Sequence, residues 1–71
     1  MNYHNLGVTL FRLSKYEDAC RNFEKSLSLN EKYDLSLSWK GDCLKFLKRY
    51  EDARKCYTLA YEINPNPVYL R

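Results

Sequence analysis

Glycine, proline and histidine are scarce in this sequence, which has two glycines, two prolines and one histidine among 71 residues. Few residues therefore interrupt regular structure, and the 45% of hydrophobic residues make the chain too apolar to be disordered. An apolar run of about 20 residues is also missing, so we expect neither a membrane-spanning helix nor a signal peptide. The length allows one small domain, residues 1–71.

The cysteines are few, odd in number and far apart: Cys20, Cys43 and Cys56. This spacing fits neither a set of paired disulfides nor a CxxC half-site for a metal. We therefore expect reduced thiols in or beside the core of an intracellular, cytoplasmic protein. No metal or other cofactor is expected.

An internal repeat is the strongest signal in the sequence. Aligning the chain with itself at a shift of 34 residues brings eight identical pairs together. Four of them form one run, Tyr16–Ala19 on Tyr50–Ala53. The other four pairs are Gly7 with Gly41, Leu10 with Leu44, Leu13 with Leu47, and Asn30 with Asn64. We therefore divide the chain into a first repeat at 1–34, a second at 35–67, and the start of a third at 68–71.

Each repeat contains two stretches with apolar residues at helical spacing. Tyr3, Leu6, Leu10 and Leu13 lie three or four residues apart, which places them on one face of a helix. Acidic residues open the second helix of each repeat, where the positive end of the helix dipole favours them. The pattern predicts an all-α chain with helices near 2–13, 17–29, 35–47 and 51–63.

Two glycines at equivalent positions inside predicted helices need a reason, because glycine costs a helix interior about 1 kcal/mol relative to alanine. We expect a close neighbour at Gly7 and at Gly41. Ala19 and Ala53 are expected to face them, with the rings of Phe23 and Tyr57 filling the adjacent space.

These residues resemble the tetratricopeptide repeat, a 34-residue helix-turn-helix unit. The matching positions in the first repeat are Tyr3, Leu6, Gly7, Leu10, Ala19, Phe23 and Ser26, and in the second Gly41, Leu44, Ala53, Tyr57, Ala60 and Pro65. Three positions depart from the pattern: Glu31 replaces the closing proline, Lys40 the leucine before glycine, and Leu37 the large aromatic.

The resemblance implies an α-solenoid whose first helices line a concave groove that binds a partner peptide or helix, within a longer scaffold protein. Ten positions of this chain match the groove positions of the family: His4, Val8, Phe11, Arg12, Leu35, Ser38, Trp39, Asp42, Lys45 and Phe46. A carboxylate clamp of lysine and asparagine, found in one subclass, is absent, because His4, Val8 and Trp39 occupy its positions. Phe11 and Trp39 are either groove anchors or rings partly packed between helices, and we expect His4 to be solvated.

Three other functions have less support in the sequence. A metal site made of His4 and the three cysteines would need ligands at spacings unlike any compact motif. The residues Lys45, Lys48, Arg49, Arg54 and Lys55 form a basic cluster that suits RNA or a solvated face, and a net charge of +3 favours the solvated face. Catalysis is not expected, because the chain has no phosphate-binding loop and only one imidazole.

The two ends of the chain suggest a self-association hypothesis. No capping residue is expected before the first helix, and Val68–Arg71 resembles the first turn of another helix. The last predicted helix would then present Tyr57, Tyr61 and Ile63 to an absent neighbour. A homo-oligomer that forms through this end is the alternative to a peptide-binding module.

Overall fold

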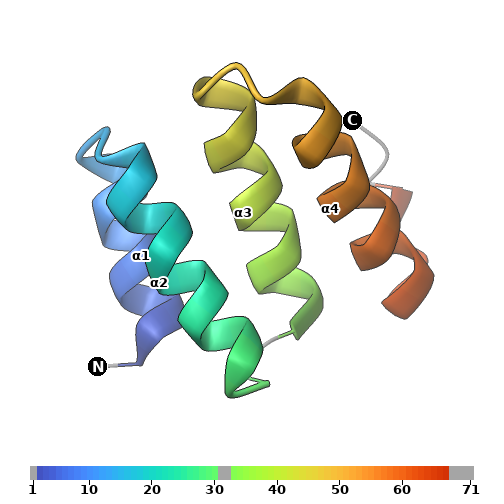
Figure 1. Ribbon diagram of the computed structural model, residues 1–71. Helices are drawn as coiled ribbons and strands as arrows, with labels where there is room; N and C mark the ends of the chain where they lie inside the picture. The colour runs from blue at the N-terminus through green and yellow to red at the C-terminus, as the bar shows by residue number, and fades with distance from the viewer. Residues whose placement is uncertain (1, 31–32, 68–71) are drawn as a thin grey trace.

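Four α-helices make up the computed structural model, which describes residues 2–30 and 33–67. They are α1 (Tyr3–Arg12), α2 (Tyr16–Ser28), α3 (Tyr33–Phe46) and α4 (Tyr50–Ile63). No strand occurs in the described ranges, so the predicted all-α class is confirmed. Figure 1 shows α3 between α2 and α4, and α1 behind α2. Each helix packs on the next one along the chain, and α1 also contacts α3.

The boundaries of the helices differ slightly from the predicted ones. The first helix begins at Tyr3, and the side chain of Asn2 caps it by accepting a hydrogen bond of 2.8 Å from the backbone N–H of Asn5. The expectation of an uncapped first helix is therefore wrong, because Asn2 is an N-cap residue outside the helix. The predicted start of a third repeat at 68–71 lies outside the described residues.

The two glycines lie beneath aromatic rings of the following helix. A Cβ atom on Gly7 would lie 2.7 Å from Cε1 of Phe23, and one on Gly41 would lie 2.8 Å from Cε1 of Tyr57. Glycine is required at both places because any side chain would overlap a ring that is itself buried. Each glycine therefore has the predicted close neighbour, but the nearest atoms belong to the ring of Phe23 or Tyr57 and not to Ala19 or Ala53, which were expected to face the glycines.

The core follows the contacts between consecutive helices. Its buried apolar members are Ala19, Cys20, Phe23, Leu37, Cys43, Leu44, Ala53, Cys56, Tyr57 and Ala60. They come from α2, α3 and α4, while α1 contributes partly buried side chains such as Val8 and Leu10. The two repeats therefore share one core that continues through α3.

Left-handed residues end three of the helices. Ser14, Asn30 and Lys48 have φ values of 63°, 64° and 63°. After α1, the N–H of Ser14 donates to the carbonyl of Phe11, and that of Lys15 donates to the carbonyl of Leu10, both at 2.9 Å. These two bonds form the Schellman motif that glycine usually closes.

We expect Ser14→Gly to raise the free energy of unfolding by about 0.5–1 kcal/mol. A non-glycine residue in the left-handed region costs about 1–2 kcal/mol, and part of this gain is lost to the greater freedom of glycine in the unfolded chain. Urea unfolding followed by circular dichroism measures the change. Ser14→Ala keeps the strain and serves as the control. Equal stability of the two variants would contradict the prediction.

Candidate functional site

Aromatic rings join α1 to α3 on the surface where the sequence predicts a groove. The Phe11 ring contacts Trp39 at a centroid distance of 5.2 Å and Phe46 at 5.5 Å, both edge to face. Tyr16, at the start of α2, stacks on Phe46 at 4.7 Å with an interplanar angle of 6°. We define the α1–α3 surface as Val8, Phe11, Arg12, Leu35, Trp39, Asp42, Lys45 and Phe46.

The members of the α1–α3 surface differ in exposure. Phe46 is 54% exposed and Leu35 is 41% exposed, which leaves apolar area open to a ligand. The side chains of Arg12 and Lys45 are also exposed, so two cations accompany these apolar groups. Phe11 and Trp39 are half-buried, which confirms that both rings pack partly between the helices.

His4 and Ser38 do not belong to the open part of this surface. His4 is only 5% exposed, so the expectation of a solvated histidine is wrong. Its Nδ1 shares a hydrogen bond of 2.9 Å with Oγ of Ser36, and that oxygen lies 2.8 Å from Oγ of Ser26. The His4 ring also meets the edge of Phe23 at 5.6 Å. These bonds satisfy buried polar atoms of α1, α2 and α3 and thereby join the two repeats.

Asp42 is held by an aromatic residue of the same repeat. The hydroxyl of Tyr57 donates a hydrogen bond to Oδ1 of Asp42. This contact fixes a half-buried carboxylate at the edge of the α1–α3 surface. Tyr16 and Ser36 also support the α1–α3 region, by the contacts with Phe46 and His4 described above. The sequence analysis assigned neither residue to a site, because an aromatic residue and a small polar residue give no signal of that role.

The predicted self-association surface is smaller than expected. Tyr57 is 5% exposed because its ring covers Gly41 and its hydroxyl reaches Asp42, so its proposed place facing an absent neighbour is wrong. Tyr61 is half-buried, and only Ile63 of the three residues is exposed. Self-association itself stays a prediction.

All three cysteines are buried and free. Burial raises the pKa of Cys20 to about 11 and that of Cys43 to about 12, and it also raises the pKa of Cys56. The Cys20 thiol in addition donates a hydrogen bond of 3.6 Å to Oε1 of Glu24. The prediction of core thiols is confirmed, whereas the cytoplasmic location inferred from them stays a prediction.

We expect the free energy of unfolding to fall between pH 9 and pH 11 as the cysteines ionise. A raised pKa in the folded chain means that the unfolded thiol loses its proton first, so the stabilising effect is complete below pH 9 and is lost as the pH rises. For Cys20 the expected loss at pH 10 is about 1 kcal/mol. Urea unfolding at pH 8 and pH 10 measures it, with Cys20→Ser as the control for tyrosine and lysine titration. Equal losses in both proteins would contradict the prediction.

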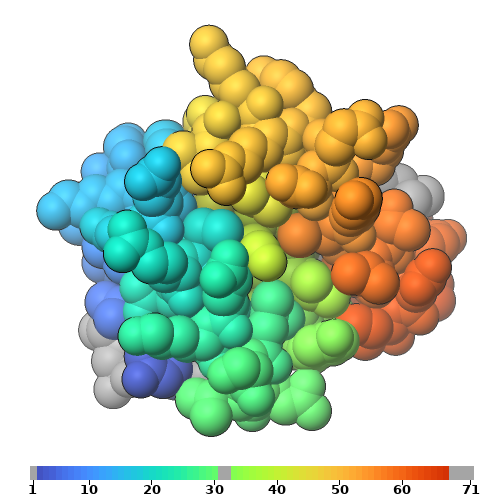
Figure 2. Space-filling model, in the orientation of Figure 1, coloured from blue at the N-terminus to red at the C-terminus, as the bar shows by residue number. Residues whose placement is uncertain are grey.

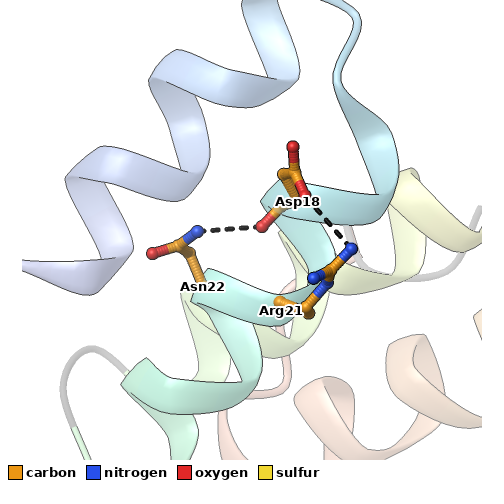
Figure 3. A network of polar contacts seen from close by, with 3 residues as sticks. All are labelled: Asp18, Arg21 and Asn22. Carbon is orange, nitrogen blue, oxygen red and sulfur yellow. Dashed lines mark hydrogen bonds and ion pairs between the residues drawn. The ribbon is translucent and has the colours of Figure 1, made fainter.

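The face that α2, α3 and α4 share carries paired charges. Figure 2 shows α3 as a narrow strip between α2 and α4 on this face. Lys40 lies 3.6 Å from Glu24 across the junction of α3 with α2. On α2, Arg21 pairs with Asp18 at 3.2 Å, and Asn22 donates to the backbone oxygen of Asp18 at 2.9 Å (Figure 3). The Arg21–Asp18 pair is exposed, and exposed pairs of this kind contribute little stability.

The basic cluster is also interrupted by acidic residues. Arg54 donates to Glu51 at 3.0 Å, and both side chains are exposed. This pairing reduces the positive potential that a nucleic acid would need. Within residues 2–30 and 33–67, no group of three or more histidine, cysteine or carboxylate side chains could hold a metal. In the same ranges no helix is long and apolar enough to cross a membrane.

Comparison with known proteins identifies the family. The family model described as tetratricopeptide repeat matches residues 1–66, which is nearly the whole chain. No curated protein and no solved structure matches the chain significantly. The 34-residue period, the paired helices and the two ring-covered glycines agree with this match. The chain therefore belongs to the tetratricopeptide-repeat family.

Proposed function

We propose that this chain binds a peptide segment or helix of a partner protein on the α1–α3 surface. Tetratricopeptide repeats generally mediate protein–protein interaction and form a non-catalytic fold. The observation that carries the proposal is the open edge of the ring cluster: Phe46 is more than half exposed although it touches Phe11 and Tyr16.

The chemistry of this surface favours a ligand with apolar and acidic side chains. Leu35 and Phe46 offer apolar area, and Arg12 and Lys45 offer positive charge. Aromatic residues and arginine are enriched among the residues that dominate binding energy. The rings of Phe11 and Tyr16 contact Phe46 and restrict its side chain, so little side-chain freedom is lost on binding.

Selection of peptides from a displayed random library, with the 71-residue chain as bait, tests the proposal. The affinity of a selected peptide is then measured through the fluorescence of Trp39, the single tryptophan of the chain. The double variant Arg12→Glu, Phe46→Ala is expected to weaken binding at least tenfold, because it removes one charge and one exposed ring.

A matched double variant, Arg21→Glu with Leu59→Ala, changes one charge and one exposed apolar side chain on α2 and α4. It is expected to bind as the original chain does. Circular dichroism confirms that both variants are equally helical. Full affinity in the first variant, or a tenfold loss in the second, would show that the α1–α3 surface is not the binding site.

A further inference from the structure

Lys40 is a charged residue at a position of the repeat that usually takes leucine. It lies directly before Gly41 on α3, where the first repeat has Leu6 before Gly7. The Lys40 side chain is only 24% exposed, and its ammonium lies 3.6 Å from Oε1 of Glu24. A charge held mostly out of water costs free energy unless polar partners offset it. The packing of the repeats does not account for this lysine, because Leu6 takes the same place in the first repeat.

Lys40 lines a cavity of about 330 Å³ that three consecutive helices form. Helices α2 and α4 pack on α3 from its two sides and hardly contact each other (Figure 1). We name this space the α2–α4 cavity. Its lining residues are Cys20, Glu24, Leu37, Lys40, Leu44, Arg49, Asp52, Lys55, Cys56 and Leu59. None of them belongs to the α1–α3 surface, so a ligand here is independent of the peptide proposed above.

Much of the lining of the α2–α4 cavity is apolar. Leu37 and Leu44 lie three and four residues from Lys40, so the three side chains share one face of α3. Cys20 and Cys56 add thiols from α2 and α4. Burial raises the pKa of both thiols, so they stay uncharged at neutral pH. Sites for small ligands are mostly apolar with a few polar groups, and their volumes begin at about 300 Å³.

The charged residues of the α2–α4 cavity favour an anion. Its cations are Lys40, Arg49 and Lys55, and its carboxylates are Glu24 and Asp52, so positive charge is in excess. Across residues 2–30 and 33–67, neither Arg49 nor Lys55 lies within ion-pair distance of a carboxylate. The 3.6 Å between Lys40 and Glu24 is longer than the about 2.7–2.9 Å of a direct bond between ammonium and carboxylate. The Lys40 ammonium can therefore donate to a second, closer carboxylate.

We infer that the α2–α4 cavity binds a free aliphatic carboxylate, a small molecule with an acidic head and an unbranched chain such as octanoate. The head accepts hydrogen bonds from the Lys40 ammonium, and Arg49 and Lys55 add positive charge from the α4 side. The chain covers Leu59, which is 47% exposed, and so removes apolar area from water. The charge selects the head of the ligand, and the leucines and thiols select its chain.

Three small molecules test the inference. Octanoate, 1-octanol and acetate are each titrated into the isotope-labelled 71-residue chain, and amide shifts are followed by NMR. We expect saturable shifts with octanoate at Cys20, Lys40 and Cys56, with a dissociation constant of about 1 mM. 1-Octanol has the chain without the charge, and acetate has the charge without the chain. Each is expected to bind at least about fivefold more weakly than octanoate, because it makes only one of the two kinds of contact.

Variants of Lys40 test its role in the α2–α4 cavity. Lys40→Leu is expected to fold, because the first repeat has leucine at the same position, Leu6. Lys40→Leu and Lys40→Gln are both expected to weaken octanoate at least about fivefold, whereas Lys40→Arg keeps the charge and most of the affinity. Lys25→Leu removes an exposed lysine of α2 outside the cavity and is the matched control. Circular dichroism verifies that all four variants are equally helical.

Four results would overturn the inference. The first is an unchanged affinity for octanoate in both Lys40→Leu and Lys40→Gln. The second is equal binding of octanoate and 1-octanol, which would leave no part for the charge. The third is a set of octanoate shifts centred on Phe11, Trp39 and Phe46, which would place the ligand on the α1–α3 surface. The fourth is the absence of shifts at about 10 mM octanoate.

Discussion

Phe23→Ala is expected to lower the free energy of unfolding by about 3–5 kcal/mol, the usual cost of removing a buried aromatic ring. The Phe23 side chain is fully buried, covers Gly7, and contacts the rings of His4 and Trp39. It therefore joins α1, α2 and α3 at one point. A chain of 71 residues has a total stability of about 4–11 kcal/mol, so this single change removes a large part of it.

Urea unfolding of Phe23→Ala and of Leu13→Ala, followed by circular dichroism, measures this effect. Leu13 is 62% exposed, so its truncation is expected to change stability by at most about 0.5 kcal/mol. If Phe23→Ala loses less than about 1 kcal/mol, or if the two variants lose equal amounts, the shared core described above is wrong.

Gly7→Ala is expected to lower the free energy of unfolding by about 1–3 kcal/mol, although alanine is the better helix former by about 1 kcal/mol. The added methyl group would lie within 2.9 Å of three ring atoms of Phe23. That ring cannot move away, because it is fully buried and His4 and Trp39 lie against it. Overpacking thus outweighs the gain in helix propensity.

A double-mutant cycle with Phe23→Leu tests the cause of this loss. Leucine is smaller than the ring, so Gly7→Ala should cost at least about 1 kcal/mol less in the Phe23→Leu chain than in the original. Gly41→Ala, beneath Tyr57, is expected to behave like Gly7→Ala in the original chain. Additive effects of Gly7→Ala and Phe23→Leu, or a stabilising effect of Gly7→Ala alone, would show that the ring is not the reason for glycine.

Much of the fold could be predicted because the two repeats carry identical or similar residues at equivalent positions. The recurrence of Gly7 at Gly41, and of Phe23 at Tyr57, identifies the helix contacts before any coordinates are known. Three of the predicted helices extend one residue too far, because the left-handed residues Ser14, Asn30 and Lys48 form the turns that follow α1, α2 and α3. Sequence periodicity does not determine that conformation.

The burial of His4 could not be predicted, because its partners belong to two other helices. Ser26 and Ser36 are ordinary small polar residues in the sequence, and only the packing of α1, α2 and α3 brings Ser36 to the imidazole and Ser26 to Ser36. The same holds for Tyr57, whose hydroxyl meets Asp42 fifteen residues earlier. The division of the predicted groove residues into buried and open ones therefore required the structure.

The most direct test of a peptide site on the α1–α3 surface is an NMR shift map of the isotope-labelled chain with a library-selected peptide. We predict shift changes concentrated in α1 and α3, largest around Phe11, Trp39 and Phe46, with little change at Arg21 and Leu59. Changes concentrated at Arg21 and Leu59, on α2 and α4, would contradict the account, because they would place the bound peptide away from the α1–α3 surface, on the face that carries the paired charges.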